Sequence, residues 1–149
     1  NTPLHWACIQ GHVAVAEALI EEHKAKIEAE SERGSTPLHY ACERGQLAVA
    51  DVLIQTHKAN VEAVDEEGRT PLHGACMWGH VEVAKALIEK HGANVEAVAC
   101  SNWYHTNGKK PVDLARDRDH KAVVALFEQA KAEEGEDAGQ MDCSTCRTS

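Results

Sequence analysis

Aromatic side chains are scarce in this chain: Phe, Trp and Tyr make up only 4% of its 149 residues, although 43% of the residues are hydrophobic. The apolar residues are mostly Ala, Val, Leu and Ile, a composition that favours close helix packing over an aromatic-lined cavity. No run of 18 or more apolar residues occurs, so we expect no membrane-spanning helix. The length suits one domain with a modest core.

Basic charge is also scarce, because 15 Lys and Arg residues stand against 24 Asp and Glu residues and give a net charge of −9. Nucleic-acid-binding proteins usually carry a basic stripe, and none appears here. We therefore expect no nucleic-acid partner. Acidic residues gather instead at two predicted turns, as Glu32, Asp65, Glu66 and Glu67. Such charges can attract a basic protein partner or can simply keep the turns soluble.

Motifs typical of common catalytic sites are missing as well. The sequence contains neither the Gly-x-Ser-x-Gly turn of a serine nucleophile nor the Gly-x-x-x-x-Gly-Lys-Ser/Thr loop that binds phosphate. We predict no catalytic residue and no cofactor. The chain begins with Asn1 inside a repeated motif and without a signal peptide, so we expect a fragment that is truncated at its N-terminus.

The dominant positive feature is a four-residue motif, Thr-Pro-Leu-His, which occurs at 2–5, 36–39 and 70–73, 34 residues apart each time. A fixed period of this length predicts a stack of small structural units. In each unit Thr can cap a helix and Pro suits its first position. A second helix with a wide apolar stripe follows, and then a tight polar turn. One unit cannot bury its apolar face, but three or more stacked units can.

The fold class expected from this pattern is an all-α repeat solenoid of stacked helix-turn-helix units with short β-hairpin-like tips. We place the domain at 1–132, with repeats at about 1–34, 35–68, 69–108 and 109–132. The fourth unit has Asp113 in place of the repeated His and polar residues around it, as is typical of a terminal cap. Its second helix is predicted from about Lys121 to Ala132. Residues 133–149 form an acidic tail without periodicity, which we expect to be disordered.

Three cysteines, Cys8, Cys42 and Cys76, occupy one repeated position. Equivalent positions in stacked helices lie about 8–10 Å apart, whereas a disulfide needs Cα atoms within roughly 7 Å. We therefore interpret them as buried free thiols of an intracellular protein, cytoplasmic or nuclear. Cys143 and Cys146 in the tail lack the two further ligands that zinc requires. Acidic flanking residues also disfavour lipid attachment at Cys146.

Histidine is abundant, with 10 residues, and most of them also follow the repeat. His5, His39 and His73 stand 34 residues apart, so they are spread along the stack. A zinc site needs four ligands that converge on one ion, and this arrangement does not provide them. We therefore predict no metal site and expect each of these histidines to hydrogen-bond to the adjoining turn.

Together these features resemble the ankyrin repeat: Thr-Pro-Leu-His-x-Ala, Gly-His, a second helix rich in Val, Leu and Ile, and Ala-Asn-Val-x-Ala. The resemblance covers residues 1 to about 130, as three good repeats and one capping repeat. The period of 34 exceeds the usual 33 by one, and the extra residue is His23, His57 or His91. The resemblance implies paired antiparallel helices with projecting hairpins. It also implies protein binding through the hairpin tips and the inner face of the first helices, without catalysis.

The resemblance assigns candidate protein-binding residues to the tips, to the ends of the first helices and to the long loop before the cap. They are Ile9, Gln10, Glu32, Arg33, Ser35, Glu43, Arg44, Glu66, Glu67, Arg69, Met77, Trp78, Trp103, Tyr104, His105, Lys109, Asp117 and Arg118. Trp78 and Trp103 can each contact a partner or cover a neighbouring repeat. Trp6 and Tyr40 share a repeated position and are expected to be partly buried between repeats. Gly74 holds the same position and is expected to leave a depression beside Trp78.

Two functions from different classes are consistent with the sequence. The first is a non-catalytic, monomeric protein–protein interaction module that presents a concave groove and hairpin tips to a protein partner. The alternative is a targeting or regulatory segment of a larger multidomain enzyme whose catalytic domain lies outside this sequence. In both cases an exposed surface, rather than a deep pocket, performs the function.

Overall fold

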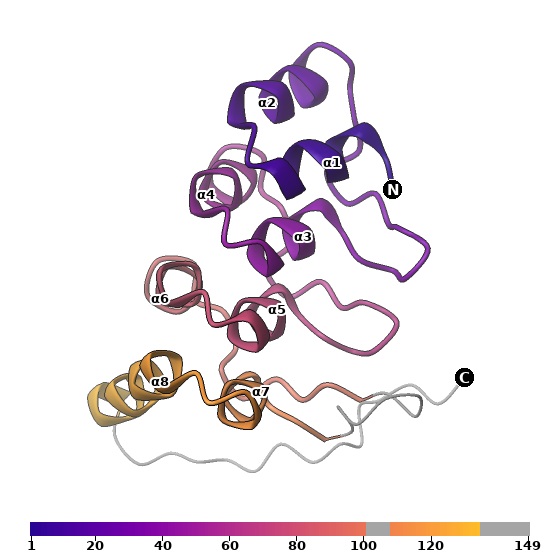
Figure 1. Cartoon of the computed structure of the whole chain (residues 1–149). Helices are drawn as coiled ribbons and strands as arrows, with labels where there is room; N and C mark the ends of the chain where they lie inside the picture. The colour runs from indigo at the N-terminus through magenta and orange to yellow at the C-terminus, as the bar shows by residue number, and fades with distance from the viewer. Residues whose placement is uncertain (101–107, 135–149) are drawn as a thin grey trace.

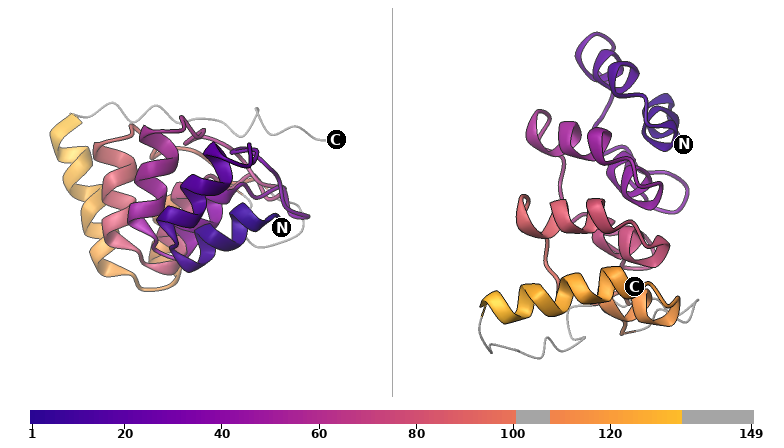
Figure 2. Two further views of the ribbon diagram at one scale, coloured as in Figure 1. Left: turned by 90° about the horizontal axis from the view of Figure 1, so that it is seen from above. Right: turned by 60° about the vertical axis from the view of Figure 1, so that its left-hand side comes forward.

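The computed structural model describes residues 1–100 and 108–134, which form pairs of helices stacked on one another (Figure 1). In chain order the helices of this part are α1 (Pro3–Gln10), α2 (Val13–Glu21), α3 (Pro37–Glu43), α4 (Leu47–Gln55), α5 (Pro71–Trp78), α6 (Val81–Glu89), α7 (Pro111–Asp117) and α8 (Lys121–Glu134). The first helices of the pairs form one row and the second helices form another, as two further views also show (Figure 2). The predicted all-α repeat solenoid is confirmed.

The helices α1, α3 and α5 each begin at a Thr-Pro pair. Thr36 has an extended backbone (φ −81°, ψ 166°), and Pro37 takes the first helical position, where its missing N–H leaves no hydrogen bond unmade. Thr36 and His39 form a reciprocal cap at this end. The helices α1 and α5 end at Gly11 and Gly79, whose φ values of 77° and 75° lie in the left-handed region that favours glycine.

One apolar core runs through the stack between the two rows of helices. Leu4, Leu38 and Leu72 of the repeated motif are 1%, 1% and 0% exposed. The second helices contribute side chains at the same interval, and Leu53 and Leu87 are also fully buried. Each repeat thus buries its apolar side against the next repeat, which is how a stack of short helices becomes stable.

The loops between repeats form hairpin-like tips, as predicted, and backbone hydrogen bonds close them. At the first tip the Ser31 N–H donates to the Ser35 carbonyl at 2.9 Å, and at the second the Asp65 N–H donates to the Arg69 carbonyl at 3.1 Å. A further backbone hydrogen bond of 3.1 Å joins the two tips. The tips project from the same side of the stack (Figure 1), so they form a continuous edge.

The fourth helical pair continues the stack beyond α5 and α6. Asp113 takes the place of the repeated His, and its carboxylate accepts a hydrogen bond from the Lys110 N–H at 3.0 Å. The second helix of this pair ends at Glu134, two residues beyond the predicted Ala132. Lys131 in its last turn lies 3.7 Å from Glu96 of the preceding repeat, which helps to hold this end against the stack.

Two segments, 101–107 and 135–149, lie outside the described residues. They include Trp103, Tyr104 and His105 and most of the predicted acidic tail. Within the described part, no helix combines the length and the apolar character that crossing a membrane requires.

The two repeated aromatic residues differ in burial. Tyr40 is half-buried, as predicted, and its ring lies nearly perpendicular to the His5 ring, at an interplanar angle of 85° and a centroid distance of 5.4 Å. Trp6 is 55% exposed, so the prediction that it is partly buried between repeats is wrong. The reason is its place in the first layer, where it lies on the outer side of α1, beside Pro3 and Val15.

Candidate functional site

The carboxyl ends of the first helices place four exposed side chains in one row. Gln10, Arg44, Trp78 and Arg118 hold equivalent positions in the four repeats, and all four were predicted contact residues. Because α1, α3, α5 and α7 pack in succession, these side chains follow one another along the stack. We call these four residues the helix-end row.

Trp78 is the largest side chain of the helix-end row and is 53% exposed. The guanidinium carbon of Arg118 lies 4.9 Å from the centroid of the Trp78 ring, which is a cation–π contact. Such contacts contribute about 0.5–1 kcal/mol at exposed sites. Arg118 therefore covers one side of the indole ring, and Trp78 remains 53% exposed.

A pocket of about 310 Å³ opens beside Trp78 and is lined by Glu43, Arg44, Trp78 and His80. The His80 Nε2 atom donates a hydrogen bond to the Glu43 carbonyl at 2.9 Å, which ties the start of α6 to the end of α3. Sequence reasoning did not assign His80 to the site. The available signal was the Gly-His pair that recurs at 11–12 and 79–80.

Glu43 occupies the space that was predicted to be an open depression at Gly74. A Cβ atom at Gly74 would lie 2.8 Å from the Glu43 Cγ atom, so the Glu43 side chain packs directly over the glycine. Burial raises the pKa of the Glu43 carboxyl above its ordinary value, and the guanidinium groups of Arg69 and Arg44 oppose this rise. Gly74 therefore does not open a depression, because Glu43 of the neighbouring repeat fills the space over it, and the hollow beside Trp78 is the pocket that Glu43 itself helps to line.

The second tip is held by an internal ion pair. Asp65 is 7% exposed, and its carboxylate accepts hydrogen bonds from the backbone N–H groups of Glu67 and Arg69, both at 2.9 Å. The Arg69 guanidinium lies 2.9 Å from Asp65 and 3.3 Å from Glu67. The sequence suggested that Asp65 is an exposed tip charge, but its carboxylate is buried and paired. Glu32 and Glu66 are the tip carboxylates that remain exposed.

Several other predicted contact residues are buried or paired. Ser35 and Met77 are 3% and 9% exposed, so their side chains do not lie on the surface as predicted. Both stand at repeat junctions, where each carbonyl accepts a hydrogen bond of 3.1 Å from a histidine of the adjacent repeat. Lys109 and Asp117 form an ion pair with each other. The remaining positions are Ile9, which is half-buried, and Arg33, which is exposed.

The repeated histidines hydrogen-bond to the adjoining turns, as predicted. The Nε2 atoms of His5, His39 and His73 donate to carbonyl oxygens of the following tip at 3.1, 2.9 and 3.2 Å. Their Nδ1 atoms accept hydrogen bonds of 2.9, 3.1 and 3.0 Å from the backbone N–H of the Thr three residues earlier. Burial lowers the pKa of all three, that of His73 to about 4. These imidazoles are therefore used by the fold.

Cys8, Cys42 and Cys76 are fully buried free thiols, as predicted. Burial raises the pKa of each thiol, that of Cys8 to about 12. A thiol with such a pKa holds very little thiolate at neutral pH, and thiolate is the nucleophilic form. These cysteines therefore serve the packing of α1, α3 and α5.

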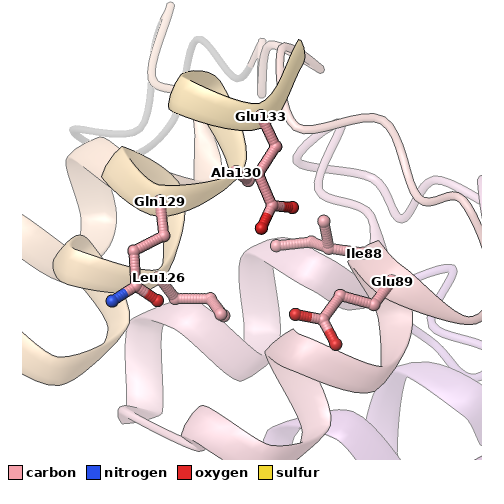
Figure 3. A pocket seen from close by; sticks show the side chains of 6 residues that line it. All are labelled: Ile88, Glu89, Leu126, Gln129, Ala130 and Glu133. Atoms are coloured by element: carbon pink, nitrogen blue, oxygen red, sulfur yellow. The ribbon is translucent and has the colours of Figure 1, made fainter.

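A pocket on the other row of helices has a different character. It measures about 370 Å³ and lies between α6 and α8 (Figure 3). Its lining consists of Ile88, Glu89, Leu126, Gln129, Ala130 and Glu133. The two carboxylates point into the opening (Figure 3), and none of the lining residues supplies an imidazole, a thiol, a hydroxyl or a cation. The helix-end row and the tips therefore remain the candidate surface.

Comparison with known families gives two matches. The family described as "Ankyrin repeats (3 copies)" matches residues 1–65, and the family described as "Ankyrin repeat" matches residues 67–100. Together the two matched segments span the first three helical pairs. A comparison with curated protein sequences gave no match.

Proposed function

The chain belongs to the ankyrin repeat family, and from this membership we propose that it is a non-catalytic module that binds a protein partner through its helix-end row and tips. Ankyrin repeats are generally protein–protein interaction modules. The observation that carries the proposal is the exposed Trp78, held by Arg118 beside the pocket at Arg44.

Trp78 and its neighbours are the residue types that contribute most to protein interfaces. Trp and Arg are enriched among the few residues that dominate binding energy. The helix-end row supplies Arg44, Trp78 and Arg118 in succession. Trp78 is 53% exposed at the edge of a pocket, where a protein partner could bury the rest of the ring.

The surface around the helix-end row is held in place before any partner binds. His80 donates to the Glu43 carbonyl at 2.9 Å, and His120 donates to the Met77 carbonyl at 3.1 Å. Each of these bonds ties the start of the second helix of one repeat to the end of the first helix in the repeat before it. A preorganised surface loses little conformational entropy on association, which favours binding.

The proposed partner carries basic residues opposite the tips. Glu32 and Glu66 are exposed, and neither forms an ion pair within the described part of the chain. Exposed carboxylates accelerate the approach of a basic partner, and salt screens this attraction over about 8 Å at physiological ionic strength. The association rate should therefore fall as salt is added, and an unchanged rate would argue against a basic partner.

The proposed working form is a monomer in a reducing compartment, in the cytoplasm or the nucleus. Cys8, Cys42 and Cys76 are buried free thiols that the stacking of the helices keeps apart, so they are compatible with this setting and do not require it.

The test is an affinity capture from a lysate of the source cells, with identification of the retained proteins by mass spectrometry. The wild-type chain is compared with the double variant Arg44→Ala/Trp78→Ala. The matched control is Lys85→Ala/Gln129→Ala, which removes two exposed side chains from the second helices. We expect proteins that the wild type and the control retain and the double variant loses. A denaturant melt should place all three proteins within about 1 kcal/mol of one another, because the substituted side chains are exposed.

A second measurement makes the result decisive. The retained protein is purified, and its dissociation constant is measured for each variant. Loss of Trp78 and Arg44 should weaken binding at least about tenfold, as for an interface hot spot. Equal binding by all three proteins would show that the helix-end row is not the binding surface.

A further inference from the structure

The helix-end row places a guanidinium group on each side of its exposed indole ring. Arg44 directly follows the end of α3, Trp78 ends α5, and Arg118 directly follows the end of α7. Because α5 packs against both α3 and α7, the two arginines flank the tryptophan. Both arginines are exposed, Arg44 lines the pocket at Trp78, and Arg118 lies over the ring. The three side chains therefore form one surface, with a cation on either side of an apolar group.

Neither of these guanidinium groups is neutralised within the described part of the chain. Most other cationic side chains there have a partner. Ion pairs hold Arg69, Lys90, Lys109, Lys110, Arg116, Lys121 and Lys131, and carbonyl oxygens three residues earlier accept from Lys24 and Lys58. The side chains of Arg44 and Arg118 form no hydrogen bond or ion pair with a described residue, although the net charge of the chain is −9. Their N–H donors are therefore available to a partner.

A carboxylate is the group that fits these donors best. A guanidinium group presents its N–H donors in a planar fork, and a carboxylate accepts them in pairs. The cation–π contact of Arg118 uses none of these donors as a hydrogen bond. The uncovered part of the Trp78 ring favours an apolar side chain beside the carboxylate. Glu43 also lines the pocket, so a partner carboxylate should meet the exposed arginines rather than the pocket floor.

The tips carry the opposite charge at the other end of the same helices. Glu32 and Glu66 are exposed and form no ion pair within the described residues. They precede the first helices α3 and α5, whereas the helix-end row follows these helices. The two helices have seven and eight residues, so they span about 10–12 Å at 1.5 Å per residue. An extended partner segment needs at least about three residues to cover that distance.

We infer that the partner binds through a bipolar segment, in which an acidic and a basic residue lie apart. An Asp or Glu of this segment, next to an apolar residue, binds at Arg44, Trp78 and Arg118. A Lys or Arg at least about three residues away binds at the tip carboxylates. The segment therefore has one orientation on the surface, because reversing it would bring like charges together. This inference rests on the proposed function, since it names the chemistry that the helix-end row and the tips receive.

The probe for the test is a displayed library of random peptides of about twelve residues, which span roughly 40 Å when extended and can reach from the helix-end row to the tips. The full chain is the target, and peptides that Trp78→Ala also retains are subtracted. Among the remaining peptides we expect Asp or Glu next to an apolar residue, and Lys or Arg three or more residues away.

A charge exchange then tests the contact itself. Binding of one selected peptide is measured by fluorescence for Arg44→Glu/Arg118→Glu and for the matched control Lys26→Glu/Lys85→Glu. The control reverses two exposed cations outside the helix-end row, so both variants change the net charge equally. The first variant should weaken binding at least about tenfold, because a paired charge is reversed. The control should weaken it less than about threefold, because salt screens distant charges.

Replacing the acidic residue of the peptide by Lys should then restore binding to Arg44→Glu/Arg118→Glu by at least about tenfold. Both arginines also follow helix ends, where a cation favours the helix dipole. A role in helix stability alone would not produce this recovery, since it does not respond to the charge of a bound peptide.

The outcomes separate this inference from the proposed function. Peptides may require Trp78 and yet lack the acidic residue beside an apolar one or the basic residue farther along. That result, or a Lys peptide that recovers no binding to Arg44→Glu/Arg118→Glu, would overturn the bipolar segment and leave the protein-binding surface in place. A selection in which no peptide requires Trp78 would overturn the proposed function itself, and the inference with it.

Discussion

The carbonyl oxygen of Arg69 lies 2.9 Å from the Nε2 atom of His39, a residue 30 positions earlier in the chain. A carbonyl can only accept, so Nε2 carries the proton of the ring. The Nδ1 atom faces the N–H of Thr36 at 3.1 Å and therefore has to accept. A proton on Nδ1 would place donor against donor, so the fold requires a neutral His39.

The first prediction concerns stability at mildly acidic pH. Burial lowers the pKa of His5, His39 and His73, the last from 6.5 to about 4. At pH values between the lowered pKa of each histidine and its ordinary pKa of 6.5, these histidines bind more protons in the unfolded chain than in the folded chain. Their contribution to the free energy of unfolding therefore falls as pH decreases. We expect a nearly constant free energy of unfolding between about pH 7 and 8 and a progressive loss from pH 6.5 toward 4, with about 3 kcal/mol lost through His73 alone. Urea melts at a series of pH values measure this loss.

The control for this prediction is His73→Asn, which removes the titrating group. This variant should be less stable than the wild type at neutral pH, since Asn lacks the Nε2 atom that donates to the Lys109 carbonyl. Its stability should nevertheless depend less steeply on pH between 6.5 and 4. Equal slopes for the two proteins would show that His73 does not stay neutral in the fold.

The second prediction compares a core residue with the tip. Leu72 is fully buried, so Leu72→Ala should cost about 2–5 kcal/mol through the cavity that it leaves. Glu66→Ala should cost less than about 0.5 kcal/mol, since this side chain is exposed and unpaired within the described residues. Adding Glu67→Ala should cost at most about 1 kcal/mol more, because Glu67 lies 3.3 Å from Arg69 at a partly exposed pair. Denaturant melts measure the loss for each variant. A larger loss of stability from the Glu66 and Glu67 substitutions than from Leu72→Ala would contradict the repeat register.

The periodic features of the fold could be predicted from the sequence because the repeat itself encodes them. The Thr-Pro-Leu-His motif gave the helix starts and the hydrogen-bonding role of His5, His39 and His73. The shared position of the cysteines gave their burial. In each case the same residues meet the same neighbours in successive repeats, so the same hydrogen bonds and the same burial recur.

The departures between repeats could not be predicted in the same way. Glu43 packs over Gly74 because the adjacent repeat lacks a side chain there, which depends on a pair of residues from two helices. Asp65 is buried because the backbone of its own tip and Arg69 both bond to its carboxylate. Trp6 is exposed because its layer is the first. The candidate site consists of such particular pairs, so its region could be predicted from the repeat but the arrangement of its side chains could not.

The third prediction concerns thiol chemistry. Cys8, Cys42 and Cys76 are buried and their pKa values are raised, so a maleimide at neutral pH should not modify them in the folded protein. The same reagent in denaturant should modify all three. Peptide mass spectrometry assigns the modification to each cysteine. Rapid labelling of Cys42 in the native protein would show that α3 opens readily, against the packing described above.

The last prediction tests the contact between Glu43 and Gly74. Ala is more favourable than Gly inside a helix by about 1 kcal/mol, so Gly74→Ala should stabilise α5 if space allows. In the wild type the new Cβ would lie 2.8 Å from Glu43 Cγ, which offsets the gain. In a Glu43→Ala background this atom is absent, and the full gain should appear. A double-mutant cycle from four urea melts measures the difference, which should reach at least about 0.5 kcal/mol.

Gly45→Ala is the control for this cycle. Gly45 has a φ of 71°, and a Cβ there would lie 2.6 Å from the His80 Nδ1 atom. The substitution should cost more than about 1 kcal/mol with or without Glu43, because the left-handed backbone disfavours Ala in both backgrounds. An equal gain from Gly74→Ala in both backgrounds would mean that Glu43 moves aside freely. Glu43 would then be a mobile surface carboxylate, available to a partner, rather than part of the packing between α3 and α5.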